Sequence, residues 1–213
     1  MRIPKHIGII PDGNRRWAIE NGLSKEQGYS SGIDPGFSLF KLCEERGISE
    51  VTYYGFTSDN TKRPVNQRLA FTKACVDAVN LLDKENAELL VIGNKDSAMF
   101  PEELKEYTSR KIFGTGGTRV NFLVNYSWEW DLSKLNNQIN PSKNIMNNLH
   151  SSDISRVDLV IRWGGRRRLS GFLPVQSVYS DFYVIDEFWP DFKKEHFYNA
   201  LSWYERQDVT LGG

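Results

Sequence analysis

The sequence predicts an α/β fold with a mainly parallel central sheet flanked by helices, and three observations lead to this prediction. Short apolar runs rich in Ile, Val, Leu and Phe alternate with segments of helical periodicity along the chain. The helical segments between these runs are long enough to serve as the crossovers that parallel strands require. No internal repeat or linker divides the 213 residues, so we expect a single domain over residues 1–213.

The first expected strand covers residues 6–10, where the run His-Ile-Gly-Ile-Ile stops at Pro11. The second is rich in β-branched and aromatic residues, and the third stops at Gly93. The expected strands are residues 6–10, 51–56, 89–92, 119–124, 158–161 and 182–185.

The expected helices are recognised by apolar side chains that recur on one face. Gly47 would stop the first of them, and Pro101 would occupy the first turn of the third. In the second, Leu69, Cys75 and Val79 would share the buried side. The expected helices are residues 37–46, 66–82, 101–111 and 192–206, and we expect a short helix and loops over 132–150 and a loop over 114–117.

The overall composition limits the function. The 27 basic and 27 acidic residues give no general basic field for nucleic acid, so any phosphate affinity must be local. Cys43 and Cys75 fit buried free thiols in a reducing compartment, and no apolar run is long enough to span a bilayer. We therefore expect a cytoplasmic protein with no membrane span and no nucleic-acid partner.

The turn after the first strand has the composition of a metal and phosphate site. Asp12 follows the strand, Gly13 permits close backbone approach, and Asn14 is suited to cap a helix carrying Arg15 and Arg16. A carboxylate beside a phosphate needs a bridging cation, and Mg²⁺ combines one or two carboxylates with phosphate oxygens in this way. The alternative is an Asx turn with solvated arginines.

A second basic turn, residues 162–170, follows the strand at 158–161. It has four arginines, a Gly pair and Ser170, which suits a diphosphate bound by guanidinium groups and a hydroxyl. A solvated basic turn or a nucleic-acid module using Arg166 to Arg168 is the alternative, and the neutral net charge disfavours the latter. In parallel sheets ligands bind beyond the carboxyl ends of strands, so the two turns predict a reaction between two phosphorylated substrates.

Five segments together resemble the cis-prenyltransferases, the undecaprenyl diphosphate synthase family. They are HIGIIPDGNRRWA, YYGFTSDNTKRP, NYSWEWDL, DLVIRWGGRRRLSGFLPVQSVYSDFYVIDEFWPDF and ALSWYERQ, and they span nearly the whole chain. The resemblance implies a homodimer with an apolar substrate tunnel, of which the helix at 66–82 would form one wall. It also implies Mg²⁺-dependent transfer of an allylic prenyl group to isopentenyl diphosphate.

The resemblance also implies roles for particular residues. Asp12 would be catalytic and hold Mg²⁺, with Asp181 as a second metal ligand, often supplied across the dimer. Asn60 would be catalytic, positioning the reacting groups together with Arg63. The residues expected to bind substrate are Gly13, Asn14, Arg15, Arg16, Trp17, Lys25, Tyr29, Arg63, Arg162, Arg168 and Ser170.

Several positions depart from the family pattern. Arg15 replaces a Gly, Lys25 an Arg, Tyr29 a His and Thr61 a Trp, while Arg166 stands where an acid is usual. Asp181 is one methylene shorter than the usual Glu. The groups that hold the leaving diphosphate are therefore altered, whereas Asp12 and the arginines of the second turn are retained.

These departures resemble the lavandulyl-type subgroup, which joins prenyl units head to middle. The resulting expectation is a short-chain synthase that condenses dimethylallyl or geranyl diphosphate with a second C5 diphosphate. Two alternatives stay open: a long-chain undecaprenyl-type synthase for a lipid carrier, and a non-catalytic partner subunit. The subunit alternative is disfavoured because such relatives lack the metal aspartate, and Asp12 is present.

Overall fold

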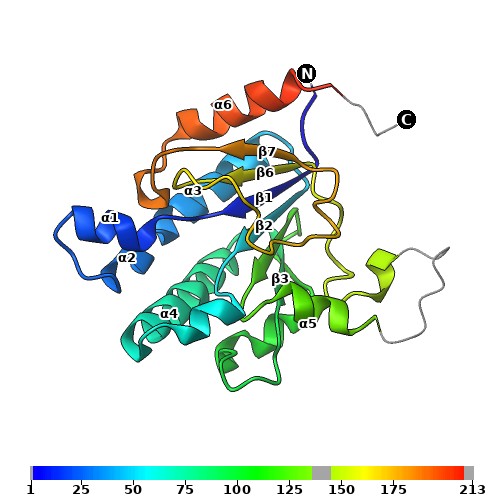
Figure 1. The fold of residues 1–213 in the computed structure, drawn as a ribbon. Coiled ribbons are helices and arrows are strands. Elements are labelled where there is room, and N and C mark those ends of the chain that lie inside the picture. Colours follow the sequence, from blue (N-terminus) through cyan, green and yellow to red (C-terminus); the bar gives the residue numbers. More distant parts are fainter. Residues whose placement is uncertain (1, 136–144, 209–213) are drawn as a thin grey trace.

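The computed structural model describes residues 2–135 and 145–208, which form a seven-stranded sheet flanked by helices (Figure 1). The strand order is β4-β3-β5-β2-β1-β6-β7, and every neighbouring pair is parallel except β3 and β4. The strands are β1 (His6–Ile10), β2 (Glu50–Tyr54), β3 (Ala87–Ile92), β4 (Lys111–Phe113), β5 (Thr118–Leu123), β6 (Leu159–Arg162) and β7 (Asp181–Val184). The predicted α/β class with a mainly parallel sheet is confirmed.

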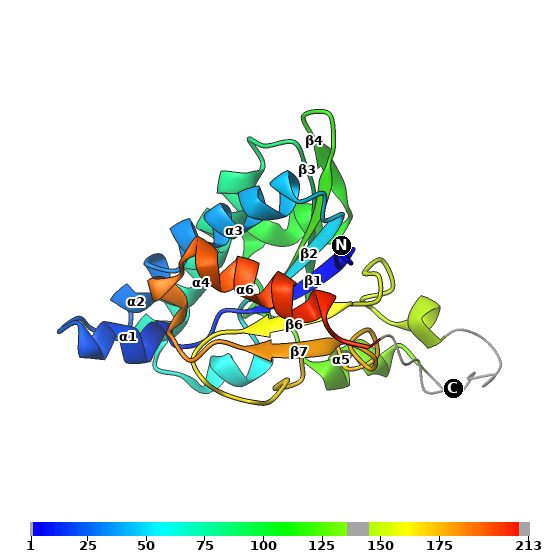
Figure 2. The same ribbon diagram turned by 90° about the horizontal axis from the view of Figure 1, so that it is seen from above.

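The sheet has an apolar cluster on each face, because alternate residues of a strand point to opposite sides. Ile9 and Tyr53 belong to the cluster beneath α3 (Ile33–Glu45), α4 (Val65–Leu82) and α6 (Lys194–Glu205). Ile10 and Tyr54 belong to the other cluster, beside α5 (Trp128–Ser133) and the loops around residues 154–173. Figure 2 shows α3 and α6 together on one side of the sheet.

The remaining elements are short. They are α1 (Asn14–Glu20), α2 (Gln27–Ser30) and the 3₁₀ helices η1 (Ser58–Lys62), η2 (Glu102–Thr108), η3 (Ile145–Asn148) and η4 (Trp189–Asp191). The predicted strand 6–10 has the bounds of β1. The predicted helix 66–82 matches α4 to within a residue, and α3 begins four residues before its predicted start because Asp34 and Pro35 fit a first helical turn.

Two predictions about elements are wrong. Within the predicted helix 101–111 only Glu102–Thr108 are helical, as the 3₁₀ helix η2, and Lys111 already begins the edge strand β4, which pairs antiparallel with β3. The polar composition suggested a helix, whereas Ile112 and Phe113 prefer the edge of the sheet. Leu69 was expected on the buried side of its helix, but it is 65% exposed.

The range 132–150, predicted to hold a short helix and loops, contains the end of α5 and the short 3₁₀ helix η3, and its residues 136–144 lie outside the described residues. The loop at 114–117 is confirmed as the turn between β4 and β5. Both cysteines are buried free thiols, as predicted. No helix in the described part of the chain is long and apolar enough to cross a membrane.

The strand register brings the polar turns together. Ile10, the last residue of β1, pairs with Arg162, the last residue of β6, and β2 ends beside them at Tyr54. The chain segments that follow these three strands therefore start side by side at one edge of the sheet. Segments 12–16 and 162–170 are the two turns predicted from the sequence, and segment 57–63 contains the predicted site residues Asn60 and Arg63.

Candidate active site

A polar basin with a volume of about 760 Å³ opens at this edge of the sheet. Twelve of the fourteen site residues predicted from the sequence line it, and the exceptions are Trp17 and Asp181. The predicted residues brought together are Asp12, Gly13, Asn14, Arg15, Arg16, Lys25, Tyr29, Asn60, Arg63, Arg162, Arg168 and Ser170. The basin therefore joins both basic turns in one space.

The Asp12 carboxylate links the two turns. Its Oδ2 accepts a hydrogen bond from Nη2 of Arg162 at 2.8 Å, and its Oδ1 lies 3.5 Å from Nη2 of Arg16. Arg162 is buried, whereas Asp12 and Arg16 are about one-third exposed. The aspartate and the arginines of both halves thus form one charged cluster.

Two glycines permit this close packing. Gly164 has φ +81°, its carbonyl accepts a hydrogen bond from Arg16 at 2.9 Å, and a Cβ there would lie 2.5 Å from Nη2 of Arg16. Gly13 has φ +108°, and a Cβ there would collide with the Phe188 ring, over which the Arg16 guanidinium lies at 4.8 Å. Both positions require a residue without a side chain.

Arg162 organises the second turn. Its Nη1 donates to Oγ of Ser170 at 2.9 Å and to the carbonyl of Arg168. Ser170 has φ +52°, a conformation uncommon for residues other than glycine, and its carbonyl accepts from the Tyr54 hydroxyl at 2.8 Å. The Arg168 side chain is exposed, which leaves its guanidinium free to meet an anion in the basin.

Tyr29 and Arg63 also line the basin and contact each other. Nη1 of Arg63 donates to the Tyr29 hydroxyl at 2.8 Å, and the Tyr29 ring stacks on Phe71 with centroids 4.6 Å apart. Arg15 lies close by, with its Nη1 3.4 Å from Oε1 of Gln67. Burial raises the pKa of Tyr29, so its hydroxyl keeps its proton at neutral pH.

Asn14 and Asn60 have different local roles from each other. Asn14 was predicted to cap α1, and this prediction is wrong. Gly13 occupies the N-cap position, and Asn14 is the first residue of the helix. The Asn14 side chain donates a hydrogen bond back to the Pro11 carbonyl at 3.0 Å. Oδ1 of Asn60 accepts from the Thr57 amide at 3.1 Å, which fixes the side chain at the start of η1. Lys25 lies exposed on the rim of the basin.

Two predicted residues lie elsewhere. Nε1 of Trp17 donates to the Asp191 carboxylate at 2.8 Å, which places the indole outside the basin and anchors α1 to η4. Asp181 begins β7, about 10 Å of strand away from the carboxyl edge of the sheet, and pairs with Arg2 at 3.6 Å. Within one chain Asp181 does not join Asp12, and a role across a dimer stays a prediction.

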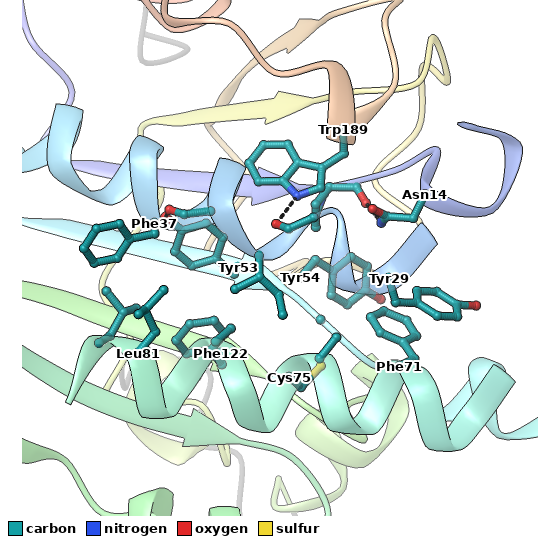
Figure 3. A pocket seen from close by; sticks show the side chains of 18 residues that line it. Asn14, Tyr29, Phe37, Tyr53, Tyr54, Phe71, Cys75, Leu81, Phe122 and Trp189 are labelled. Atoms are coloured by element: carbon teal, nitrogen blue, oxygen red, sulfur yellow. Dashed lines mark hydrogen bonds between the residues drawn. The ribbon is translucent and has the colours of Figure 1, made fainter. Parts of the chain in front are cut away.

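An apolar cavity of about 80 Å³ adjoins the basin, and Pro11, Asn14 and Tyr29 are among the residues that line both. It extends between α3 and α4, with Tyr29 and Phe71 at one end and Phe37, Leu81 and Phe122 at the other (Figure 3). Helix α4 forms one wall, as predicted. The structure thus has an apolar space beside the polar basin.

Sequence reasoning missed the residues that shape this cavity. Trp189, from η4, covers one side and donates from Nε1 to the Gly32 carbonyl at 2.8 Å. Phe71, Cys75 and Leu81 line it from α4. The helical periodicity marked Cys75 as buried, but periodicity does not distinguish a side chain that packs in the core from one that lines a cavity.

The residues present fit a magnesium ion held by one protein carboxylate. Asp12 carries the carboxylate nearest the basic turns, and the part of the chain that the structure describes has no cluster of three or more acidic, His or Cys side chains suited to a metal. Mg²⁺ commonly binds through one carboxylate together with substrate phosphate oxygens and water. Such an ion would therefore depend on a bound diphosphate.

A parallel sheet, a basin with two basic turns and an adjoining apolar cavity define an α/β enzyme class that binds phosphorylated, partly apolar substrates. Residues 10–212 match the protein-family profile described as "Putative undecaprenyl diphosphate synthase". The chain belongs to this family, the cis-prenyltransferases, and is a prenyltransferase.

Individual relatives of the chain support this family assignment. The chain is 32% identical to a ditrans,polycis-undecaprenyl-diphosphate synthase specific for (2E,6E)-farnesyl diphosphate from Buchnera aphidicola, covering 98% of this chain and 91% of that protein. It is also 32% identical to an isoprenyl transferase from Nitrosomonas europaea, covering 99% and 86%. Its fold is similar to that of lavandulyl diphosphate synthase from Lavandula x intermedia, solved with dimethylallyl diphosphate, with TM-score 0.84, 21% identity and 99% of each chain covered.

Proposed function

We propose that this prenyltransferase is a Mg²⁺-dependent short-chain prenyl diphosphate synthase. It would condense dimethylallyl or geranyl diphosphate with a second C5 diphosphate. The observation that carries the proposal is the pairing of a large polar basin, bordered by two basic turns, with a small apolar cavity. The basin would hold two diphosphate groups, and the cavity would hold a short prenyl tail.

The donor would lie with its tail in the apolar cavity and its diphosphate at the Asp12 turn. Arg16, held by the Gly164 carbonyl and the Phe188 ring, offers a positioned guanidinium to the phosphate oxygens. Asp12 would hold Mg²⁺, which when bound neutralises charge on the departing diphosphate. Asn60 and Arg63, which line the same basin, would orient the reacting end of the donor.

The acceptor diphosphate would lie on the second turn, where Arg162, Arg168 and Ser170 converge. In the reaction the allylic C–O bond of the donor breaks, diphosphate leaves, and the alkene of the acceptor forms the new C–C bond. The acceptor then loses a proton to restore a double bond. Since Asp12 already contacts Arg162, the two substrates would react beside one carboxylate.

The size of the cavity favours a short product. Its volume of about 80 Å³ is well below the roughly 300–1,000 Å³ typical of pockets for small-molecule ligands, and aromatic rings stand at its far end. The change at Arg15 and Tyr29 supports a head-to-middle condensation in which dimethylallyl diphosphate is both donor and acceptor. A long-chain synthase, as the undecaprenyl relatives are named, is the alternative outcome.

Product analysis tests the proposal. The purified protein is incubated with Mg²⁺ and dimethylallyl diphosphate alone, then with added isopentenyl diphosphate, then with geranyl and isopentenyl diphosphates. We expect C10 to C15 diphosphates, and turnover of dimethylallyl diphosphate alone if the condensation is irregular. Products of C50 to C55 would establish the long-chain alternative instead.

The same assay separates the third possibility, a non-catalytic subunit. A chain that is inactive with every substrate pair, but active once a second subunit is added, would contradict catalysis by this chain alone.

We also expect a cytoplasmic homodimer, in which Asp181 of one chain would approach the metal of the other. Sedimentation analysis measures the oligomeric state directly.

A further inference from the structure

Trp128 is a large apolar side chain that the proposed reaction does not use. It is the first residue of α5, which follows β5 at the same edge of the sheet as the basin, and it is 43% exposed. Trp128 does not line the basin. Its indole packs instead on Gly171, since a Cβ added to Gly171 would lie 2.9 Å from Cδ1 of Trp128. The side chain therefore contacts the residue that directly follows the second basic turn.

The backbone at this contact has an unusual conformation. Ser170 has φ +52° and Gly171 has φ +80°, so two consecutive residues lie in the left-handed region. A residue such as Ser170 keeps this conformation only where the surrounding structure enforces it. The Tyr54 hydroxyl bonds the Ser170 carbonyl at 2.8 Å, and the Trp128 indole packs on Gly171. One aromatic side chain thus contacts each of the two residues.

The position of Ser170 matters for the charged cluster in the basin. Oγ of Ser170 accepts from Nη1 of Arg162 at 2.9 Å, and Nη2 of the same arginine donates to Asp12 at 2.8 Å. A shift of the backbone at Ser170 would therefore change a contact of Arg162, the residue that links the two turns.

Helix α5 holds Trp128 in a fixed place. Asp131 on this helix is 2% exposed and accepts hydrogen bonds from the Tyr126 hydroxyl at 2.9 Å and from Oγ of Ser151 at 2.6 Å. Nε2 of Gln176, which is also buried, donates to the same Oγ of Ser151 at 2.7 Å. A buried network thus joins the helix that carries Trp128 to the chain that follows the second basic turn.

We propose that Trp128 is a positioning residue for the acceptor, because its indole holds the Ser170–Gly171 backbone in the conformation that presents Ser170 and Arg162 to the diphosphate. The proposal rests on the proposed function, which assigns this turn to the acceptor. Trp128 would act through the turn and would not touch the substrate itself. Another aromatic ring should therefore replace it, whereas a small side chain should not.

Calorimetry with isopentenyl diphosphate alone measures acceptor binding without turnover. We expect W128A to weaken binding about fivefold and W128F to weaken it less than about twofold, because a phenyl ring still covers Gly171. Trp203 is a half-buried indole on α6 that packs on Tyr183 and does not line the basin, so W203A is the matched control. W203A should keep wild-type affinity, and melting temperatures of all three variants show whether each is folded.

A double-mutant cycle tests the contact itself. In the wild-type background G171A places its Cβ against the indole, whereas in the W128A background that collision is absent. We expect the loss of acceptor affinity caused by G171A to be about threefold smaller in the W128A background. Equal losses in the two backgrounds would show that Trp128 does not act through Gly171.

The outcomes separate this role from the proposed function. Wild-type affinity in W128A, or equal affinity in W128A and W203A, would overturn the role of Trp128. Prenyl transfer by the wild-type protein is measured separately. Turnover with an unaffected W128A refutes only the positioning role, whereas weakened binding in W128A without wild-type turnover refutes only the proposed function. A wild-type protein that binds no isopentenyl diphosphate would overturn both.

Discussion

At the scale of single residues, Arg162 connects the two halves of the site. It ends β6, is buried, and contacts Asp12 on one side and Ser170 on the other. A buried guanidinium is stable only when its donors are satisfied, and in this structure its Nε lacks a partner among the described residues. Arg162 therefore keeps one buried N–H donor, at Nε, that no described residue uses.

Arg168 provides the first prediction. Its side chain is exposed on the second turn, so it can be removed without disturbing packing. We expect R168A to raise the KM for the acceptor diphosphate about tenfold with a much smaller change in kcat, because one charge-assisted contact is lost in both the bound and transition states. Steady-state kinetics compare the acceptor KM of R168A with that of the control R167A, which removes an exposed arginine that does not line the basin. Equal KM values would show that Arg168 does not contact the acceptor diphosphate.

His6 is a residue whose role is structural. It is 1% exposed, and its Nε2 lies 2.8 Å from Oγ1 of Thr52, which in turn bonds Asn121. These contacts tie β1, β2 and β5 together at the amino edge of the sheet, away from the basin. Burial lowers the pKa of His6, although Glu50 nearby opposes the shift.

This shift predicts how stability depends on pH. The unfolded chain takes up a proton on His6 near pH 6.5 while the folded chain does not, so stability falls as pH decreases below about 6.5. We expect H6Q to have a lower free energy of unfolding than the wild-type protein at pH 7.5. Below pH 6.5 the free energy of unfolding of H6Q should fall less steeply with pH, with a slope smaller by up to ~1.4 kcal/mol per pH unit. Urea unfolding at pH 7.5, 6.5 and 5.5 measures both slopes.

Because burial also lowers the pKa of His150, an H150Q variant is measured in parallel. A pH dependence of H6Q equal to that of the wild-type protein would contradict the assignment of this effect to His6.

At the scale of elements, the turn between β6 and β7 must approach α1 closely. We expect G164A to weaken donor diphosphate binding about tenfold, since its Cβ would displace Arg16. The free energy of unfolding of G164A should also fall by more than the ~1 kcal/mol that an alanine at positive φ costs by itself. Gly47 has φ +68°, and a Cβ added there would have no other atom within 4 Å, so G47A is the matched control.

Thermal unfolding and substrate titration of G164A and G47A separate the cost of the positive φ angle, which both variants share, from the contact with Arg16, which only G164A makes. If G164A and G47A lose the same stability and the same substrate affinity, the close approach of Arg16 to Gly164 does not contribute to diphosphate binding.

The elements themselves were largely predictable because burial leaves a clear pattern in the sequence. The strand at 6–10 is a continuous buried run, and the second half of α4 buries Ala74, Cys75, Val79 and Leu82 at helical spacing. The edge strand β4 was missed because it is short and partly exposed and lies between Arg110 and the glycine-rich turn at 114–117, so neither alternation nor length revealed it. Pairing with β3 determines its conformation more than its own composition does.

At the scale of the whole molecule, the parallel register explains why the site could be predicted before the structure. The strands β1, β2 and β6 end at one edge, so residues more than a hundred positions apart, such as Asp12 and Arg162, meet there. The apolar cavity was expected only through the family resemblance. Its lining residues come from α1, α2, α3, α4, β2, β5, η4 and the segments between them, and no local pattern marks such a set.

The closed end of the cavity yields a prediction about product length. Leu81 lines the end far from the basin, and L81A would open space there for an additional isoprene unit (Figure 3). We expect the product distribution to shift toward chains one unit longer. Leu69 lies on the same helix but is 65% exposed and does not line the cavity, so L69A is the matched control.

Chromatography of the products formed with dimethylallyl and isopentenyl diphosphates measures the shift. Identical products from L81A and the wild-type protein would show that this end of the cavity does not limit the chain.

We propose that Asp12 serves both diphosphates at the centre of the basin. Pyrophosphate release by D12N with dimethylallyl and isopentenyl diphosphates tests it most directly, beside E45Q, which changes an exposed carboxylate at the end of α3. We predict that D12N lowers kcat by about a thousandfold, equivalent to ~4 kcal/mol, with an unchanged melting temperature, and that E45Q retains wild-type activity. A folded D12N protein with kcat within about tenfold of the wild-type value would contradict the account.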